Sequence, residues 1–293
     1  MKKTILFSLL LLTCLCLFSA CGAESQETSG LEYELIDGEV IIKSYEDSTA
    51  RRTLVIPDEI DGKPVTKIDK FGIANAESLL EIHIGKNVKE IDDWGIANNG
   101  NLFKFTVDPD NEYFYAVDGV LFNKQRTKLI SYPERHQDPY DESFLDLNVN
   151  KSIPSAPEVT DEVDLIYVVP EGVQELAPHS FYCVDRLEKL VLPDSLKRIG
   201  NMALFQMYGL KEINFPEGLE SIGKDGVAFC TSLTEIELPS TIKKLEKYAF
   251  FDCNKVTKVT VKAKQSDVEQ GELWYPSDNG KELNELQIIW QNG

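Results

Sequence analysis

Three histidines, His83, His136 and His179, are the side chains best suited to act as general bases or zinc ligands in this chain of 293 residues. None belongs to an H-E-x-x-H pattern or lies beside a cysteine or another histidine at ligand spacing. His83 alternates with Ile82 and Ile84, which places it on the solvent side of a short strand. No G-x-S-x-G nucleophile motif occurs either. We therefore interpret the histidines as structural or surface residues.

The segment Gly218–Asp225 imitates the phosphate-binding pattern G-x-x-x-x-G-K. Asp225 stands where Ser or Thr would hold magnesium, and its carboxylate would repel phosphate. Leu219 and Ile222 also belong to a hydrophobic repeat described below. We reject a phosphate-binding loop here.

The acidic run Asp108–Glu112 suggests calcium binding. An EF-hand loop that begins at Asp108 requires Gly at its sixth position and Glu at its twelfth, where Tyr113 and Gly119 stand. This excludes an EF-hand and leaves open weak calcium binding by scattered surface acids. A hydrolase using Asp108 and Glu112 would need loss of activity in D108N/E112Q as evidence. The sequence predicts no enzyme, with no catalytic residue, cofactor or metal site.

The N-terminal segment 1–20 carries Lys2 and Lys3, followed by an uncharged apolar run. It is too short and wrongly flanked for a stable membrane span, and it is typical of a secretory signal. Its removal changes the net charge from 30 − 49 = −19 to 28 − 49 = −21. Such a polyanion is a poor partner for nucleic acid or an anionic membrane surface.

The signal ends in the letters LFSAC, which resemble the lipobox of bacterial lipoproteins, although Phe18 stands where Leu is usual. The resemblance implies that Cys21 is diacylated and becomes the new N-terminus. An ordinary signal peptide cut at Ala20 or Ala23 is the alternative. Residues 21–30 are mostly small and polar or acidic, and we predict a flexible tether there.

Prolines and apolar residues recur every 23 residues along the chain. The proline column is Pro170, Pro193, Pro216 and Pro239. The apolar columns are Leu187, Leu210, Leu233 and Val256; Leu190, Ile213, Ile236 and Val259; Leu192, Phe215, Leu238 and Val261; Val173, Leu196, Leu219 and Ile242; and Leu176, Ile199, Ile222 and Leu245. Columns in register over several copies predict a solenoid with about one coil per repeat.

Each coil is expected to contain a short parallel strand. Alternation points Leu190 inward and Lys189 and Val191 outward. The proline that follows cannot donate to a ladder and ends the strand. A small-plus-aromatic step such as Ala249-Phe250 predicts about one turn of helix. The expected class is therefore α/β but β-rich, with short parallel strands, turns and short helical segments.

These motifs resemble the BspA-like leucine-rich repeats of bacterial surface proteins. Leu233–Pro239 (LTEIELP) and Tyr248–Cys253 (YAFFDC) show the pattern best. Asp118–Pro133 resembles the irregular hairpin coil of that family. The resemblance implies a leucine-rich-repeat solenoid capped at both ends. It also implies adhesion, or contact with proteins or glycans, without naming a ligand.

The chain is divided accordingly. Its predicted parts are a lipoprotein signal peptide at 1–20, a tether at 21–30, an N-terminal cap and first repeat block at 31–133, an inserted loop at 134–166, a second repeat block at 167–261 and a C-terminal cap at 262–293. The N-terminal cap would be a hairpin over Leu31–Tyr45 with Asp37-Gly38 as its turn. The C-terminal cap would cover the open end of the solenoid.

Other cysteines and the aromatic residues are assigned to packing. Cys230 and Cys253 are one period apart in what resembles the family's cysteine column, and Cys183 is the third cysteine of the body. The odd count favours buried thiols over a disulfide, which stays open. Phe181, Phe229 and Phe250 are expected in the core rather than in a carbohydrate site.

We therefore expect an extracytoplasmic, lipid-anchored binding protein that recognises a protein or glycan at the cell surface. The alternative is a structural or scaffolding envelope lipoprotein whose partners belong to its own cell. The membrane, a Gram-positive plasma membrane or an outer membrane, stays open, as do the ligand and the oligomeric state. The candidate binding residues are the outward strand positions Glu81, His83, Lys104, Thr106, Lys189, Val191, Glu212, Asn214, Glu235, Glu237, Lys258 and Thr260.

Overall fold

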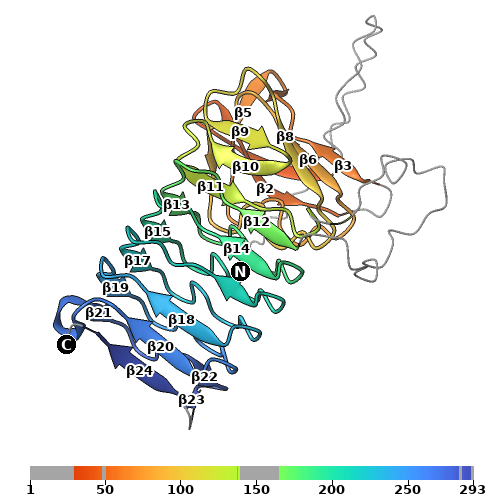
Figure 1. Ribbon diagram of the computed structural model, residues 1–293. Helices are drawn as coiled ribbons and strands as arrows, with labels where there is room; N and C mark the ends of the chain where they lie inside the picture. The colour runs from red at the N-terminus through yellow and green to blue at the C-terminus, as the bar shows by residue number, and fades with distance from the viewer. Residues whose placement is uncertain (1–29, 48–50, 137, 139–164, 284–285, 292–293) are drawn as a thin grey trace, which may run out of the picture.

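The computed structural model describes residues 30–47, 51–136, 138, 165–283 and 286–291. The expected signal peptide at 1–20, the lipidation residue Cys21 and most of the expected tether and inserted loop lie outside these residues. The described chain is a strand-rich β-solenoid of about 9 turns, whose coils follow one another along the molecule (Figure 1). No helix in this part of the chain is long and apolar enough to cross a bilayer.

One side of the solenoid, named here the long-strand face, carries parallel strands in three separate sheets of three. These strands are β3 (Thr53–Val55), β6 (Glu81–Ile84) and β8 (Lys104–Val107); β12 (Ile166–Val168), β14 (Lys189–Val191) and β16 (Glu212–Ile213); and β18 (Glu235–Leu238), β20 (Lys258–Val261) and β24 (Gln287–Trp290). In β6, Ile82 and Ile84 are fully buried, whereas Glu81 and His83 are partly exposed. The apolar columns therefore point into the coils, as the alternation predicts.

The opposite side, the short-strand face, is one sheet of eight strands. Its members are β9 (Phe114–Val117), β10 (Val120–Asn123), β11 (Lys128–Ser131), β13 (Glu175–Leu176), β15 (Arg198–Ile199), β17 (Ser221–Ile222), β19 (Lys244–Leu245) and β21 (Glu269–Gln270). The strands β9, β10 and β11 pair antiparallel, which confirms the expected irregular hairpin coil. The remaining strands pair in parallel, one per coil.

The N-terminal hairpin forms as the sequence predicts. Strands β1 (Leu31–Ile36) and β2 (Glu39–Tyr45) pair through Asp37 and Gly38, whose φ angles of 51° and 83° suit a type I′ turn. In the same sheet, β2 pairs with β5 (Lys63–Ile68), which also pairs with β4 (Glu59–Ile60) and β7 (Glu90–Ile91). Every residue of β1 after Leu31 is exposed, so the capping role of the hairpin stays a prediction.

The C-terminal segment 262–293 was expected to leave the repeat and form a cap, but its described part forms a further, longer coil. Lys244 pairs with Glu269 and Lys258 with Gln287, so the spacings are 25 and 29 residues. The extra length holds a 3-10 helix at Gln265–Asp267 and a hairpin of β22 (Ser277–Asp278) and β23 (Lys281–Glu282). Because β24 extends the sheet of β18 and β20 sideways, the expected cap is not confirmed.

The expected helical step at Ala249-Phe250 is wrong, because the structure has a turn there. Tyr248 and Asp252, which flank the step, have φ angles of 64° and 54°, in the left-handed region that interrupts a right-handed helix. The amide of Phe250 donates to the carbonyl of Trp274 in the next coil at 3.0 Å. Amides used between coils cannot make the i to i−4 bonds of an α-helix.

Asn111 is a polar residue of the core whose side chain forms hydrogen bonds with the backbone. It is fully buried, and its Nδ2 donates to the carbonyls of Gly85 and Val88 at 2.8 and 2.9 Å. Its Oδ1 accepts from the amides of Tyr113 and Phe114 at 2.8 and 2.7 Å. The side chain therefore satisfies four backbone groups where the coil turns into the β9–β10 hairpin.

Replacing Asn111 by Leu should destabilise the fold strongly, since the carbonyl of Val88 and the amides of Tyr113 and Phe114 lose their partner at about 1–3 kcal/mol each before relaxation. We expect the free energy of unfolding of the full chain in urea to fall by about 3 kcal/mol or more. The control N254L changes an exposed asparagine and should shift it by less than about 0.5 kcal/mol. Equal stability of N111L and N254L would contradict this role of Asn111.

Candidate functional site

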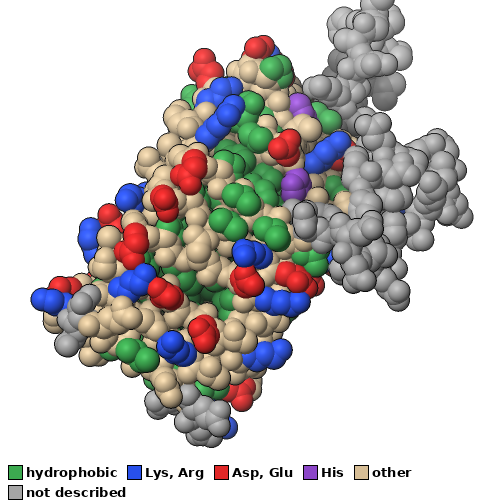
Figure 2. All heavy atoms as spheres, viewed as in Figure 1, with side chains coloured by type: hydrophobic (Ala, Val, Ile, Leu, Met, Phe, Trp, Pro, Cys, Tyr) green, Lys and Arg blue, Asp and Glu red, His purple; other side chains and the backbone are tan. Residues whose placement is uncertain are grey.

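The candidate binding residues all lie on or directly beside the strands of the long-strand face, but its three sheets divide them into three groups. The first group is Glu81, His83, Lys104 and Thr106 on β6 and β8; the second is Lys189, Val191, Glu212 and Asn214 at β14 and β16; the third is Glu235, Glu237, Lys258 and Thr260 on β18 and β20. Figure 2 shows charges of both signs scattered over the lower, C-terminal part of this face and apolar side chains gathered nearer its middle, around β12.

In the first group, residues 23 positions apart lie side by side and pair with each other. The ammonium of Lys104 is 2.6 Å from the carboxylate of Glu81. His83 Nδ1 is 2.9 Å from the Thr106 hydroxyl oxygen. The side chain of Glu81 is only 12% exposed and that of Lys104 is 32% exposed, so this ion pair lies partly within the surface of the sheet.

The second group surrounds a groove of about 460 Å³. Lys189 and Glu212 pair across it at 2.6 Å, with side chains that are 44% and 66% exposed. A second pair, Lys211 with Glu188, follows at the same distance. The residues that line the groove are Lys189, Leu190, Val191, Lys211, Glu212, Ile213, Asn214, Thr234 and Glu235. The structure therefore brings five of the candidate residues together: Lys189, Val191, Glu212, Asn214 and Glu235.

Asn214 is exposed, as predicted, and its side chain also has a structural role. Its Oδ1 accepts from the amide of Leu192 at 2.8 Å, and its Nδ2 donates to the carbonyl of Leu192 at 2.9 Å. The side-chain amide thus replaces backbone groups at the end of the β14–β16 ladder. A ligand could contact Asn214, but both ends of its amide already have a partner.

Thr260, in the third group, requires a correction. It was expected to face solvent, but it is only 8% exposed. Its strand is flanked on both sides, with Glu237 opposite it on β18 and Ile289 opposite it on β24. Glu235, Glu237 and Lys258 remain exposed.

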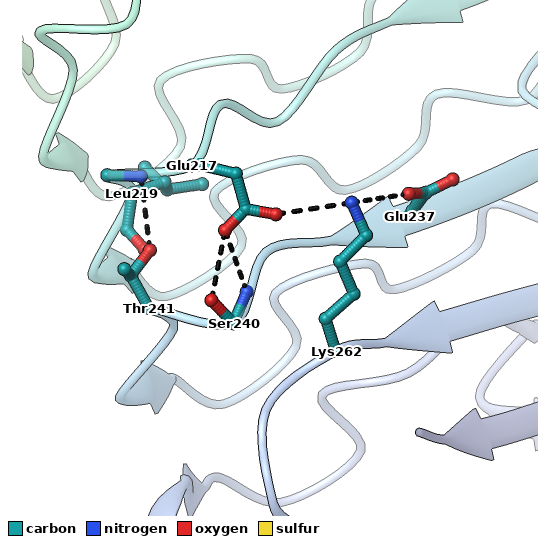
Figure 3. A network of polar contacts seen from close by, with 7 residues as sticks. Glu217, Leu219, Glu237, Ser240, Thr241 and Lys262 are labelled. Carbon is teal, nitrogen blue, oxygen red and sulfur yellow. Dashed lines mark hydrogen bonds and ion pairs between the residues drawn. The ribbon is translucent and has the colours of Figure 1, made fainter. Parts of the chain in front are cut away.

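The sequence analysis missed Lys262, which links the third group to the preceding coil (Figure 3). Its ammonium lies 2.7 Å from the Glu237 carboxylate and 3.2 Å from that of Glu217. A hydrogen bond to Glu237, and to a smaller extent one to Glu217, raises the pKa of Lys262. Glu217 also accepts from the amide and hydroxyl of Ser240, both at 3.1 Å. Glu217 and Ser240 are 23 residues apart, which is one repeat period. This spacing was the sequence feature that could have indicated that the two residues lie side by side in neighbouring coils.

The base of the inserted loop is held by a buried ionic cluster. Asp138, whose side chain is 1% exposed, accepts from Arg135 Nε at 2.6 Å and also pairs with Arg186. Arg135 further donates to Asn101 at 3.3 Å and lies over the ring of Phe103. The cluster fixes the point at which the chain leaves the coils. Residues 139–164 of the expected inserted loop lie outside the described residues.

The protein-family model of the BspA type leucine-rich repeat region matches residues 44–160 and 168–275 of this chain, with six copies of the repeat. The chain belongs to the BspA-type leucine-rich repeat family. No curated protein matches the sequence.

Two solved structures share the fold of this BspA-type protein. A leucine-rich repeat protein from Eubacterium ventriosum has a TM-score of 0.55 and 21% identity, over 75% of this chain and 55% of that one. A leucine-rich cell surface protein from Faecalibacterium prausnitzii has a TM-score of 0.52 and 21% identity, over 75% of this chain and 59% of that one. This chain thus covers less than two thirds of both proteins. Both belong to a class of repeat scaffolds that typically bind rather than catalyse.

The cysteines of this BspA-type protein that the structure describes are all free thiols. Cys230 and Cys253 are fully buried, and each thiol donates to a carbonyl 26 residues earlier, at 3.2 Å to Leu204 and 3.1 Å to Val227. Burial raises the pKa of the Cys230 thiol, which makes it unreactive. Among the described residues, no three His, Cys, Asp or Glu side chains come together as a metal site.

The aromatic residues were only partly assigned correctly. Phe181 and Phe250 are fully buried, as predicted. Phe229 is instead partly exposed, in a column of rings along the turn side, with ring centroids 5.0 Å from Phe205 and 5.7 Å from Phe251. The rings pack against rings of neighbouring coils, so we assign the column to coil stacking.

Glu134 has an unusual protonation state beside the base of the inserted loop. Burial, and secondarily the charge of Asp185, raises the pKa of Glu134 to about 8. The folded protein therefore favours the protonated, neutral form of the Glu134 carboxyl group. Because the folded pKa exceeds the ordinary value of 4.5, the stabilising contribution is complete below about pH 4.5 and is lost as the pH rises to about 8.

We expect Glu134→Gln to remove this loss of stability. At pH 9 the variant should exceed wild type by a few kcal/mol, since each pKa unit corresponds to about 1.4 kcal/mol, while the two should be similar at pH 4.5. Urea unfolding of the full chain at both pH values measures the difference. E134D, which keeps an ionisable carboxyl, serves as the control and should retain the decline. If E134Q declined as steeply as wild type, another group would be responsible.

Proposed function

We propose that this protein is a lipid-anchored recognition protein of the cell surface that binds a protein or glycan ligand through the long-strand face. The observation that carries the proposal is the groove at β14 and β16, where five outward residues from neighbouring coils meet. A solenoid repeats such positions along its length, which favours an extended interface with a large partner over a small-molecule pocket.

The chemistry of the face supports binding. Its exposed charges occur in pairs of opposite sign, such as Lys189 with Glu212, that are individually weak. A partner with complementary charges can replace these pairs without leaving a buried charge unpaired. The apolar side chains of Ile166 and Val168 on β12, 43% and 60% exposed, add hydrophobic surface beside the groove.

The proposed location depends on the N-terminus. The LFSAC motif would attach a lipid at Cys21, and acyl chains must supply the membrane affinity because the protein body is strongly acidic. The related fold in a cell surface protein of Faecalibacterium prausnitzii is consistent with this placement. A short polar segment between Cys21 and Leu31 would keep the solenoid away from the bilayer.

Protease treatment of intact cells tests the location. We expect release of peptides from coils 167–261, because a surface-anchored solenoid is accessible. Mass spectrometry of released and retained peptides measures this, with a cytoplasmic protein as the lysis control. Complete protection of a membrane-associated body would contradict surface display and favour an envelope scaffold.

The triple variant K189A/E212A/E235A tests the binding face. It removes three groove charges, and we expect at least about a tenfold loss of binding to host matrix proteins or arrayed glycans by cells that display it, as for a central interface cluster. The control E175A/R198A breaks a 2.8 Å ion pair on the short-strand face and should bind within about twofold of wild type. Unchanged binding by the triple variant, or equal losses in both, would contradict the assignment.

A further inference from the structure

The ladder of the long-strand face is interrupted between β8 and β12, where the inserted loop leaves the coils, and again between β16 and β18, where consecutive coils follow each other directly. The amide of Lys211 donates to the carbonyl of Glu188 in the preceding coil at 2.8 Å, and Thr257 donates to Thr234 at 3.0 Å in the same way. Between these two levels the bond is missing: the amide of Thr234 has no backbone acceptor among the residues that the structure describes. Within these residues, β16 and β18 likewise belong to different sheets. One edge of each strand is therefore open.

The opening is confined to this side of the coils. On the short-strand face, β17 pairs with β19 at Ser221 with Lys244. On the turn side, the amide of Val227 donates to Ala249 at 2.8 Å. Because two of the three sides remain stacked, the gap between β16 and β18 is a slot in an otherwise continuous solenoid rather than a boundary between two bodies.

The slot coincides with a larger side chain. Phe215 occupies the column that holds Leu192 and Leu238 in the neighbouring coils. Its ring lies 5.8 Å from that of Phe250, and Ile213, two residues earlier, is only partly buried, whereas Leu190 is fully buried. Phe215 is thus larger than the residues of this column in the neighbouring coils, and Asn214 maintains the contact with the preceding coil through its side chain.

The chemistry of the slot favours a peptide over other ligands. The groove is lined by two lysines, Lys189 and Lys211, and two glutamates, Glu212 and Glu235, so no net charge attracts an ionic ligand. Lys189 pairs with Glu212, and Lys211 pairs with Glu188. No aromatic side chain lines it, which disfavours stacking of a sugar ring. What it offers is the open backbone edges of β16 and β18, and an extended peptide is the ligand that pairs with a strand edge.

We propose that the slot between β16 and β18 binds an extended peptide segment of a protein partner by adding it to the strand edges. This inference rests on the proposed function and specifies its partner as a protein with an accessible extended segment. Strand β18 has four residues, about 13 Å of strand, so the segment pairs over about four residues.

Hydrogen exchange of the free full chain tests the slot without any variant. The amides of Thr234 and Glu235 should exchange at least about 100-fold faster than that of Lys211, which has its bond to Glu188. Equal protection of these amides would overturn the inference, because the strand edge would then be closed.

Binding is tested with random twelve-residue peptides displayed on phage and selected on the full chain, after which enriched peptides are synthesised. The variant N214V/F215L makes Ile213–Pro216 similar to Leu190–Pro193 and should close the slot. We expect a Kd at least tenfold weaker for this variant, and protection of the Thr234 and Glu235 amides when peptide binds wild type. The control E175A/R198A, which breaks the 2.8 Å ion pair on the short-strand face, should leave the Kd within twofold.

The outcomes separate the slot from the binding face as a whole. Peptides that bind N214V/F215L as tightly as wild type, or that protect other strands, would overturn the slot while leaving the proposed surface function intact. Failure to enrich any peptide would overturn it as well. Loss of cell binding in K189A/E212A/E235A, with unchanged binding in N214V/F215L, would again retain the face and reject the slot. Folding of each variant is verified by urea unfolding.

Discussion

The hydrogen bonds between successive coils are the interaction on which the rest of this structure depends. On the turn side, amides such as that of Phe250 donate to the next coil. On the two strand faces, parallel pairing joins residues 23 positions apart, as at Arg198 and Ser221. A single coil cannot satisfy these groups or bury its apolar column, so stability arises only from stacking. The outward columns are a consequence, because stacking fixes which side chains lie beside one another.

Coil-to-coil bonding leaves some interior carbonyls without a backbone donor, and different side chains fill this need. Asn99 Nδ2 donates to the carbonyl of Ile73 at 2.9 Å, and the thiol of Cys253 donates to that of Val227 at 3.1 Å. Both acceptors lie 26 residues before their donors, so the two side chains perform the same task in different coils. Cys230 and Cys253 are therefore best explained by backbone satisfaction in a tight core, which is consistent with the burial of both thiols and with the raised pKa of Cys230.

The period of 23 residues was sufficient to predict the strand registers and the inward columns, since both follow from spacing alone. It placed Glu81 beside Lys104 and Glu235 beside Lys258, and the structure confirms both pairs. It was insufficient for the turn side, where a small-plus-aromatic step suits either a helical turn or the left-handed turns that form. The slot could not be predicted from the hydrophobic pattern either. Phe215 matches the apolar column as well as Leu does, and the two residues differ only in the volume of the side chain.

A solenoid of this kind can open one ladder without losing its fold. Each coil contacts its neighbours along three sides, and the energy of stacking is approximately a sum over these nearest-neighbour interfaces. At the slot, the short-strand face and the turn side remain bonded, while Asn214 satisfies the backbone of Leu192. A binding groove can therefore arise from a change at two adjacent residues, Asn214 and Phe215, with its cost limited to a single interface. In a globular core the overpacking caused by a larger side chain would be transmitted to all surrounding elements, which is why a repeat architecture suits local variation of a recognition surface.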